Sequence, residues 1–193
     1  NGLRNVDVNT LDYVFEAEPV AEGPEGEQVV VMRLPVSGDA SLEYRYTIYD
    51  TASPERDYLV GFDVRLVNMA REMANQTQIQ IDWSNTSYQN EKGFKNENMY
   101  TTVAYRFPGE KSVEELGMSE EEKSKEVTSS LNWVAFKQQF FSSVFIAPEN
   151  VSYADLGFST AHPGSGYVKD FTARMTVPYT PQTEGDDFAF YFG

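Results

Sequence analysis

Apolar and polar residues alternate with a period of two along most of this chain. In residues 42–49 (LEYRYTIY), every second residue from Leu42 to Ile48 is apolar or aromatic. Residues 58–67 and 78–83 repeat the alternation. Successive side chains of a strand point to opposite faces, so each segment predicts a β-strand with one buried face. The alternation, bounded by Gly, Pro and Asn, predicts strands over residues 28–34, 42–49, 58–67, 78–83, 99–107, 131–136, 140–146, 167–177 and 187–192.

The segments between these strands are less regular. Residues 11–16 are a short strand candidate, and the polar residues 84–98 indicate a long surface excursion or the end of a hairpin. Residues 112–127 are the one predicted helix, because Ser112 with Glu115 and Ser119 with Glu122 match the capping-box spacing. Nine strands and little helix predict a mainly antiparallel β-sandwich, and an unbroken composition predicts a single domain over residues 1–193.

The segment from Trp133 to Pro148 (WVAFKQQFFSSVFIAP) is the most apolar part of the chain. It holds five aromatic residues and no acidic residue. Its spacing fits either a helix or a strand, and the Phe and Val content favours a strand with a kink at residues 137–139. We therefore expect a central strand covered on both faces, with Trp133, Phe140 and Ile146 mostly buried.

Composition and charge exclude several classes of protein. The 193 residues include 14% aromatics and carry a formal net charge of −15. Nucleic acids and anionic head groups are bound by clustered cations, so neither is an expected ligand. The absence of cysteine excludes disulfides, thiol nucleophiles and thiolate metal sites.

No apolar segment reaches the roughly 18 residues of a membrane-spanning helix. The apolar strand over residues 188–192 reaches almost the last residue of the chain. We therefore expect this chain to be the soluble part of a larger membrane protein, cut away from its membrane segments.

Candidate catalytic and metal-binding residues are few. The single histidine, His162, lies in a Gly- and Ser-rich loop, where a solvated residue is expected rather than a general base. Ser165 lacks the strand–turn–helix context of a nucleophile elbow. Glu184, Asp186 and Asp187 cluster near a turn without the spacing of a calcium loop.

Two further acidic residues, Asp63 and Asp82, lie on predicted strands opposite the apolar faces, so we expect them to face water. We expect no catalytic residues, no metal and no cofactor in this chain.

The apolar segment resembles part of the extracytoplasmic (periplasmic) domain of YidC-type bacterial membrane protein insertases. In that family a tryptophan opens the run, an aromatic-Phe pair follows and an aliphatic residue near a proline closes it. Trp133, the pair Phe140-Phe141 and residues 146–148 fill these places. Weaker matches in the same order are GFDVRLVN at residues 61–68, IQIDW at 79–83 and FYFG at 190–193. The acidic insert over residues 111–126 departs from the family pattern.

The resemblance implies a β-supersandwich similar to that of galactose mutarotases, on the periplasmic face of the bacterial inner membrane. It also implies a non-catalytic part in protein transport and chaperone function, namely partner docking and spacing during membrane protein insertion. The implied partners, reached through the full-length protein, are components of the Sec translocon and nascent membrane proteins. The resemblance further places one set of aromatic residues nearest the membrane or a partner, with the polar segments 84–98 and 111–126 directed away from the lipid: Phe188, Phe190, Tyr191 and Phe192.

Two other interpretations remain open from the residues alone. The first is a carbohydrate-binding or carbohydrate-processing sandwich, because Tyr44, Tyr46, Tyr88 and Tyr100 could be exposed and carboxylates are abundant. The second is an unrelated secreted or lipid-anchored sandwich of the adhesion type.

Overall fold

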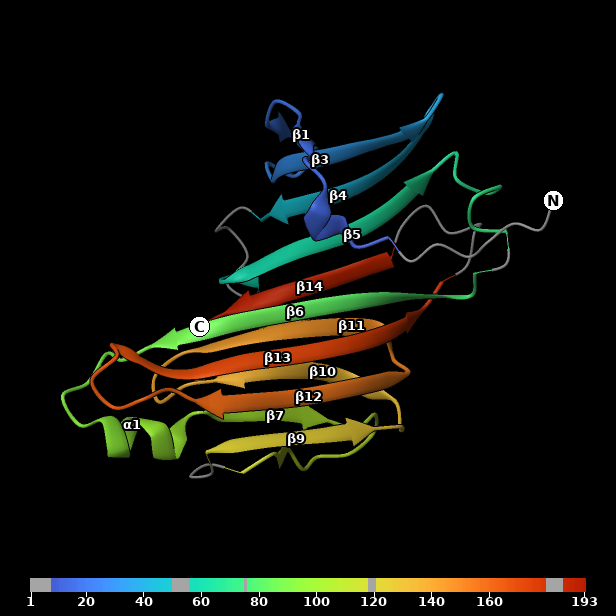
Figure 1. Ribbon diagram of the computed structural model, residues 1–193. Helices are drawn as coiled ribbons and strands as arrows, with labels where there is room; N and C mark the ends of the chain where they lie inside the picture. The colour runs from blue at the N-terminus through green and yellow to red at the C-terminus, as the bar shows by residue number, and fades with distance from the viewer. Residues whose placement is uncertain (1–7, 50–55, 75, 118–120, 180–185) are drawn as a thin grey trace.

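The computed structural model describes residues 8–49, 56–74, 76–117, 121–179 and 186–193 (Figure 1). These residues form two antiparallel sheets that lie face to face. Sheet A has ten strands in the order β1-β3-β4-β5-β14-β11-β10-β7-β8, with β2 also paired to β3, and sheet B has the order β6-β13-β12-β9. The prediction of a mainly antiparallel β-sandwich with little helix is confirmed.

The strand bounds locate each pairing in the sequence. Sheet A contains β1 (Glu16–Ala17), β2 (Ala21–Glu22), β3 (Gln28–Ser37), β4 (Ala40–Ile48), β5 (Leu59–Val67), β7 (Thr102–Arg106), β8 (Glu114–Glu115), β10 (Leu131–Lys137), β11 (Ser142–Val151) and β14 (Asp186–Phe192). Sheet B contains β6 (Gln78–Tyr88), β9 (Glu122–Val127), β12 (Tyr153–Thr160) and β13 (Tyr167–Pro178). The helical elements are the 3-10 turn η1 (Thr10–Asp12) and the helix α1 (Phe94–Tyr100).

Aromatic rings join the two sheets at the centre of the core. The ring of Phe136 in β10 is fully buried and stacks on Trp83 of β6, with ring centroids 3.9 Å apart. The other side of the Phe136 ring stacks on Phe171 of β13 at 4.9 Å. Burial of large aromatic side chains, with stacking between them, supplies much of the packing energy of such a core. The alternation that groups Ile79, Ile81 and Trp83 on one face of β6 is thereby confirmed.

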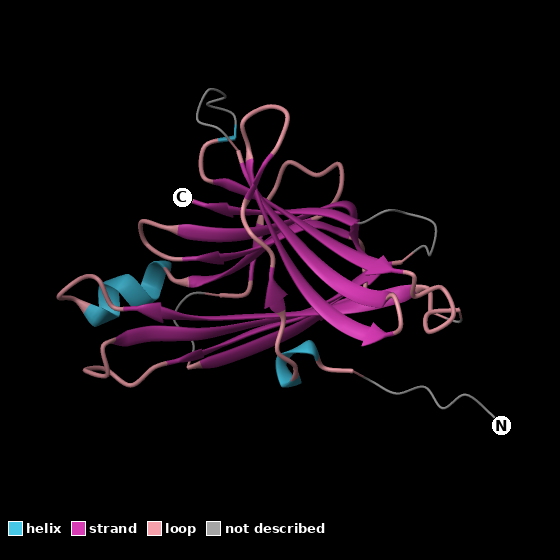
Figure 2. Ribbon diagram, turned by 90° about the horizontal axis from the view of Figure 1, so that it is seen from above, coloured by secondary structure: helices cyan, strands magenta, loops and turns pink. Residues whose placement is uncertain are grey.

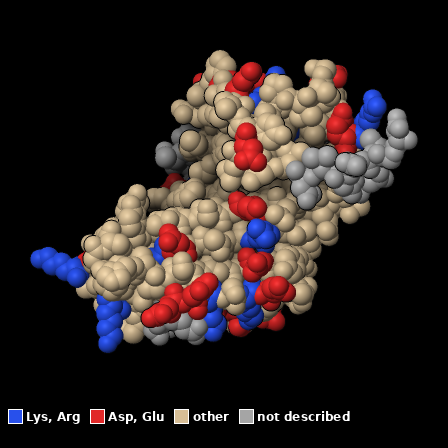
Figure 3. Space-filling view, in the orientation of Figure 1, with Lys and Arg blue, Asp and Glu red and all other residues tan. Residues whose placement is uncertain are grey.

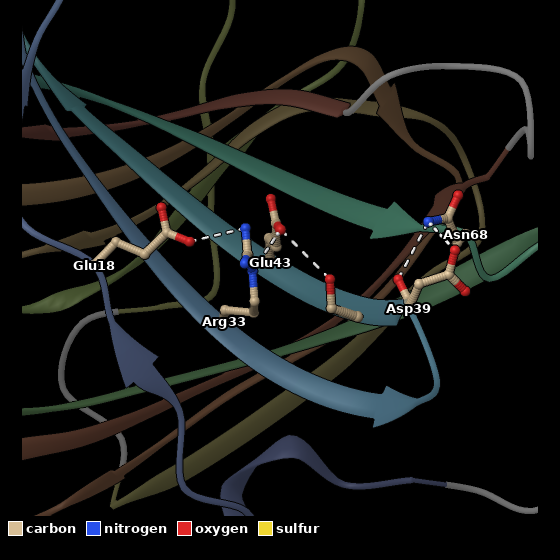
Figure 4. A network of polar contacts seen from close by, with 6 residues as sticks. Glu18, Arg33, Asp39, Glu43 and Asn68 are labelled. Atoms are coloured by element: carbon tan, nitrogen blue, oxygen red, sulfur yellow. Dashed lines mark hydrogen bonds and ion pairs between the residues drawn. The ribbon is translucent and has the colours of Figure 1, made fainter.

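Strands β3, β4 and β5 extend beyond the area that sheet B covers, and we call them the wing (Figure 1). The N-terminal segment covers part of the wing's inner face. There Tyr44 stacks on Phe15 at 4.8 Å and donates a hydrogen bond to the Thr10 hydroxyl at 3.0 Å. The outer face of the wing carries charged pairs, among them Arg33 with Glu18 and Glu43 at 2.8 and 2.9 Å (Figure 4).

The helix predicted over residues 112–127 is wrong. Residues 114–115 form β8 and residues 122–127 form β9, while residues 118–120 lie outside the described part of the chain. Three residues of β9 lie on the inner face of sheet B, because they pair with core residues of β12. They are Lys123, Lys125 and Val127, which lie opposite Phe158, Leu156 and Ala154. The Lys125 ammonium donates to the Tyr105 hydroxyl at 2.6 Å. Long lysine stems can cover apolar surface while the charge reaches a polar partner, so a charged sequence was able to form a strand here.

The polar segment 84–98 is not a simple excursion. Its first residues extend β6 as far as Tyr88, and its last belong to helix α1. Helix α1 also takes the first residues of the predicted strand 99–107, so β7 begins only at Thr102. The strand candidate 11–16 is wrong for most of its length, because the Asn9 side chain caps η1 by accepting from the Leu11 amide.

The aromatic segment also differs from its prediction. The expected kink at residues 137–139 is a chain reversal, closed by a hydrogen bond from the Gln138 amide to the Phe141 carbonyl at 2.8 Å. Residues 138–141 therefore form the turn of a hairpin between β10 and β11. Strand β12, which had no counterpart among the predicted strands, follows directly and crosses to sheet B.

Two buried charged residues hold helix α1 against the sandwich. The Glu97 carboxylate is 1% exposed and accepts hydrogen bonds from the Asn90 and Glu91 amides at 3.0 to 3.1 Å. Lys169 in β13 is also buried, and its ammonium donates to the Thr101 carbonyl at 2.6 Å. A charge taken out of water is tolerated when its hydrogen bonds are satisfied in this way.

Candidate functional site

Strands β10 and β11 present apolar residues on both faces. Val134, Phe136 and Phe145 point inward and are fully buried in the core. Their sequence neighbours, including Trp133 and Val144, point to the outer face of sheet A, against which the described residues place no second sheet. The two faces of this hairpin therefore have different surroundings, although both are apolar.

The outer face is hollowed into a shallow groove of about 530 Å³. Ala104 and Ala135 lie opposite each other in the sheet and are small, so they form the floor between larger neighbours. The Arg106 guanidinium lies 5.9 Å from the centre of the Trp133 ring. The groove is lined by Ala104, Val113, Glu115, Trp133, Ala135, Lys137, Ser142, Val144, Ile146 and Tyr191, and we call these residues the outer groove.

One ion pair marks the polar side of the outer groove. The Lys137 ammonium lies 2.7 Å from a Glu115 carboxylate oxygen. Both side chains are partly exposed, so this pair contributes little to stability. The remaining lining is dominated by aliphatic and aromatic side chains, which suits an apolar partner surface and offers no acid–base pair.

The burial expected for the aromatic segment is only partly observed. Phe140 is 60% exposed at the hairpin turn, so the prediction that it is buried is wrong. Trp133 and Ile146 are half-buried on the outer face, not enclosed in the core. The reason is that sheet B covers only the inner face of the hairpin.

The four C-terminal aromatics divide between the core and the surface. Strand β14 lies inside sheet A between β5 and β11 and is not an edge. Phe188 is buried, and Phe190 packs on Phe145 at 5.3 Å. Tyr191 and Phe192 are 37% and 47% exposed, and Tyr191 lines the outer groove.

The polar segments do not lie at the opposite end from these residues. The end of β6 joins α1 through residues 89–93, and α1 lies at the same end of the molecule as the C-terminus (Figures 1 and 2). Gly117 also lies there, because its carbonyl accepts from the Thr102 hydroxyl at 2.6 Å. Residues 84–98 and 111–126 were expected to point away from the end that carries the C-terminal aromatic residues. Parts of both segments instead lie at that same end.

Among the candidate catalytic residues, His162 and Ser165 share one loop, whereas Asp63 and Asp82 lie on strands of different sheets. His162 is exposed, and its Nδ1 lies 2.8 Å from the Pro163 carbonyl oxygen. Ser165 lies in the same loop, where its amide donates to the His162 carbonyl at 3.0 Å. Glu184 lies outside the described residues. In the part of the chain that the structure describes, no group of three or more His, Cys, Asp or Glu side chains could hold a metal ion.

The two strand carboxylates have basic neighbours. Asp63 is only 17% exposed and lies 3.9 Å from both Arg45 and Arg65 on the outer face of the wing. Asp82 is half-exposed and lies 3.3 Å from Arg174. The expectation that both carboxylates face water therefore holds for Asp82 and only in small part for Asp63.

The tyrosines considered for carbohydrate binding do not form one platform. Tyr44 and Tyr46 are half-buried on the inner face of the wing, where Tyr46 stacks on Phe62 at 5.1 Å. Burial, and to a smaller extent the neighbouring Tyr44, raise the pKa of Tyr46 above its ordinary value and so favour the neutral phenol. Tyr88 and Tyr100 are exposed at the ends of β6 and α1, away from the wing's inner face.

The sequence did not reveal the outer groove. Its members come from five separated segments. Ala104 and Val113 carry no motif, although Tyr191 belongs to the FYFG match and was among the residues expected near the membrane or a partner. One feature of the sequence could have indicated the groove, namely that both faces of residues 133–146 are apolar. A strand of this kind is either covered by packing on both faces or leaves one apolar face exposed. Within the described residues, no helix is long and apolar enough to cross a membrane.

Comparison with known proteins gives a consistent result. Residues 2–193 match the family described as the YidC periplasmic domain. The chain is 33% identical to the membrane protein insertase YidC of Bacteroides fragilis over 96% of its length and 28% of the relative's length. It is 34% identical to that of Phocaeicola vulgatus, over 98% of this chain and 29% of the relative. It is 32% identical to that of Porphyromonas gingivalis, over 99% of this chain and 30% of the relative.

The chain spans less than a third of the length of these relatives. The family match covers nearly every residue, including both sheets and the outer groove. The resemblance carried by the segment from Trp133 to Pro148 is thereby confirmed, and this chain belongs to the YidC periplasmic domain family.

Proposed function

We propose that this chain is a non-catalytic domain of a membrane protein insertase on the periplasmic face of the bacterial inner membrane. As a single β-sandwich domain, it docks and positions partners while the rest of the full-length protein moves nascent membrane proteins into the bilayer. Family membership supports the placement, because the matched family is a periplasmic domain and the relatives are named membrane protein insertases.

The outer groove is the observation that carries the docking role. It is an apolar surface on the uncovered face of sheet A, and a half-buried tryptophan, Trp133, is among its lining residues. Exposed apolar patches with polar rims mark protein interaction sites, and tryptophan is enriched among the residues that dominate binding energy. A component of the Sec translocon is the partner we propose for this groove.

The proposed function includes no catalytic reaction in this domain. Insertion transfers an apolar segment from water into lipid and breaks no covalent bond, so it needs neither nucleophile nor base. The dispersed positions of His162, Asp63 and Asp82 support a domain that acts only through binding.

Photo-crosslinking in the full-length insertase tests the docking role. A photoreactive phenylalanine at Tyr191 lines the outer groove, whereas one at Thr172 lies exposed on the outer face of sheet B. We expect protein crosslinks from position 191, including to a translocon component, and none from position 172. Equal crosslinking from both positions would contradict a specific docking surface.

A charge placed at the rim of the groove should weaken the same contact. Val113 is 50% exposed and lines the outer groove, so Val113→Arg adds a cation there without disturbing the core. We expect the crosslinked fraction from position 191 to fall about tenfold, which corresponds to roughly 1.4 kcal/mol of binding free energy. Val36→Arg is the matched control, because Val36 is 46% exposed in the wing and away from the groove. Unchanged crosslinking in Val113→Arg would show that the outer groove is not the docking surface.

A further inference from the structure

Exposed aromatic side chains gather at one end of the molecule. Of the exposed Phe and Tyr residues in the described ranges, only Tyr13 of the N-terminal segment lies elsewhere. The others are at least 37% exposed, and we call them the aromatic end: Tyr58, Tyr88, Tyr100, Phe140, Phe141, Tyr167, Tyr191 and Phe192.

Hydrogen bonds bring the sheet A members of this set together. The Phe192 amide donates to the Tyr58 carbonyl at 2.9 Å. The Gly193 amide donates to the Ser142 carbonyl at 3.0 Å, directly after the turn that carries Phe140 and Phe141. The C-terminal residues, the start of β5 and the β10–β11 turn are therefore neighbours at one end of sheet A.

The sheet B members lie at the same end. Tyr88 pairs with Tyr167 across β6 and β13, with ring centroids 5.1 Å apart. Helix α1 connects this end of β6 to the start of β7, and Lys169 fixes the junction through the Thr101 carbonyl. Figures 1 and 2 show α1 and the C-terminus at the same end of the molecule.

The charge of this end differs from that of the whole chain. The turn at 138–141, the loop at 161–167 and residues 190–193 contain no acidic residue, in a protein with a net charge of −15. Lys92 and Lys95 are exposed before and within α1, and basic side chains project from this end in Figure 3.

Acidic residues are present at the borders of the aromatic end. Asp57 and Glu91 are exposed beside it, and Glu121 and Glu122 lie at the corner where β9 begins. Glu97 is buried and its carboxylate is satisfied by backbone amides, so it does not add to the surface charge.

We propose that the aromatic end rests in the head-group region of a lipid bilayer. Tyrosine suits this interface because its ring is apolar and its hydroxyl is hydrated, and phenylalanine rings bury at the boundary with the acyl chains. This end has two exposed lysines beside the four exposed acidic residues at its borders, so the aromatic rings, and not a cluster of cations, carry the contact with the leaflet. This inference rests on the proposed function only in taking the domain to lie at a membrane.

The geometry of the turn favours insertion without rearrangement. Phe140 and Phe141 are 60% and 58% exposed, yet the turn is closed by the Gln138-to-Phe141 hydrogen bond and braced by Gly193. A preorganised surface loses little conformational freedom on binding. The pair therefore forms a fixed apolar tip of the domain.

Vesicle partitioning of the 193-residue chain tests the proposal. We expect the chain to sediment with sucrose-loaded vesicles of phosphatidylethanolamine and phosphatidylglycerol. The double variant F140S/F141S should lower the partition coefficient about tenfold, because two interfacial rings are removed. The control V14S/V36S removes two exposed apolar side chains that lie outside the aromatic end and should leave partitioning unchanged. Failure of the wild-type chain to bind, or equal losses in both variants, would overturn the proposal.

Site-directed spin labelling gives the orientation. The chain contains no cysteine, so F141C and V36C each provide one attachment site. On vesicles, the label at position 141 should become accessible to lipid-soluble oxygen and shielded from a water-soluble nickel complex, while the label at position 36 should stay in water. Lipid contact at position 36, or none at position 141, would overturn the orientation.

Charge reversal at Lys92 and Lys95 measures the electrostatic contribution to vesicle binding separately from that of the aromatic rings. K92E/K95E should reduce binding to vesicles containing phosphatidylglycerol and leave binding to purely zwitterionic vesicles nearly unchanged. Equal losses on both vesicle types would overturn the role of the two lysines. Failure of vesicle binding together with protein crosslinks from position 191 would remove the lipid contact and leave the docking role in place. Protein crosslinks from position 141 in the full-length insertase would assign this end to a protein partner instead.

Discussion

Replacing Phe136 by alanine is expected to lower the free energy of unfolding by about 3–5 kcal/mol. The side chain is fully buried and stacks on Trp83 of one strand and Phe171 of another, both in the opposite sheet. Its removal leaves a cavity between the two sheets and breaks both stacking contacts. Denaturation in urea, followed by circular dichroism, measures the change in midpoint at constant slope.

Phe140→Ala is the matched control, because Phe140 lies in the same hairpin but is 60% exposed. We expect a change within about 0.5 kcal/mol, as for other surface substitutions. The sequence alone predicts a loss of about 3–5 kcal/mol at this position as well, since it treats Phe140 as a core residue. A large loss in Phe140→Ala with a small loss in Phe136→Ala would contradict the packing described above.

Replacing Glu97 by alanine is expected to lower the free energy of unfolding by about 2–4 kcal/mol. Its buried carboxylate satisfies the Asn90 and Glu91 amides, which would lose their acceptor on the inner side of the loop. Hydrogen bonds to a charged group contribute more than neutral ones, so this loss exceeds that of an ordinary surface glutamate. Hydrogen exchange should show faster exchange at these two amides, and urea denaturation should give the total loss.

Two variants separate the carboxylate from the helix itself. Glu97→Gln keeps one acceptor oxygen and the side-chain volume, so it should lose less stability than Glu97→Ala. Lys95→Ala lies on the exposed face of the same helix and should be nearly neutral. If Lys95→Ala were as damaging as Glu97→Ala, the effect would come from the helix and not from the buried carboxylate.

The strands predicted from alternation were located well where one face is buried and the other is polar. Residues 28–34, 42–49, 58–67 and 167–177 each lie within or close to an observed strand. The prediction failed where tertiary pairing decides the structure. Residues 122–127 look like a solvated helix, but pairing with β12 draws them into a strand whose lysines reach Tyr105 and neighbouring side chains.

The candidate site was less accessible to sequence reasoning than the fold. The aromatic content of residues 133–148 correctly indicated an important segment, but the sequence does not reveal that only one face of it is covered. Sheet B packs on the inner face of sheet A, and within the described residues no further sheet packs on its outer face. The outer groove follows from this arrangement, whereas the ring of Phe140 is exposed because it lies in the turn between β10 and β11.

The position of β14 within sheet A constrains the order in which the domain can form as it emerges from a translocation channel. Of the described strands this one comes last in sequence, yet it joins the wing on one side to β11 on the other. Until residues 186–192 arrive, sheet A exists as two separate pieces whose facing backbone groups are unpaired. The final pairing links residues about 130 positions apart in sequence, such as Val60 and Phe190, and such long-range closure is slow. During export, the wing and the remaining strands therefore stay open to chaperones, or to pairing with another chain, until the last few residues have crossed.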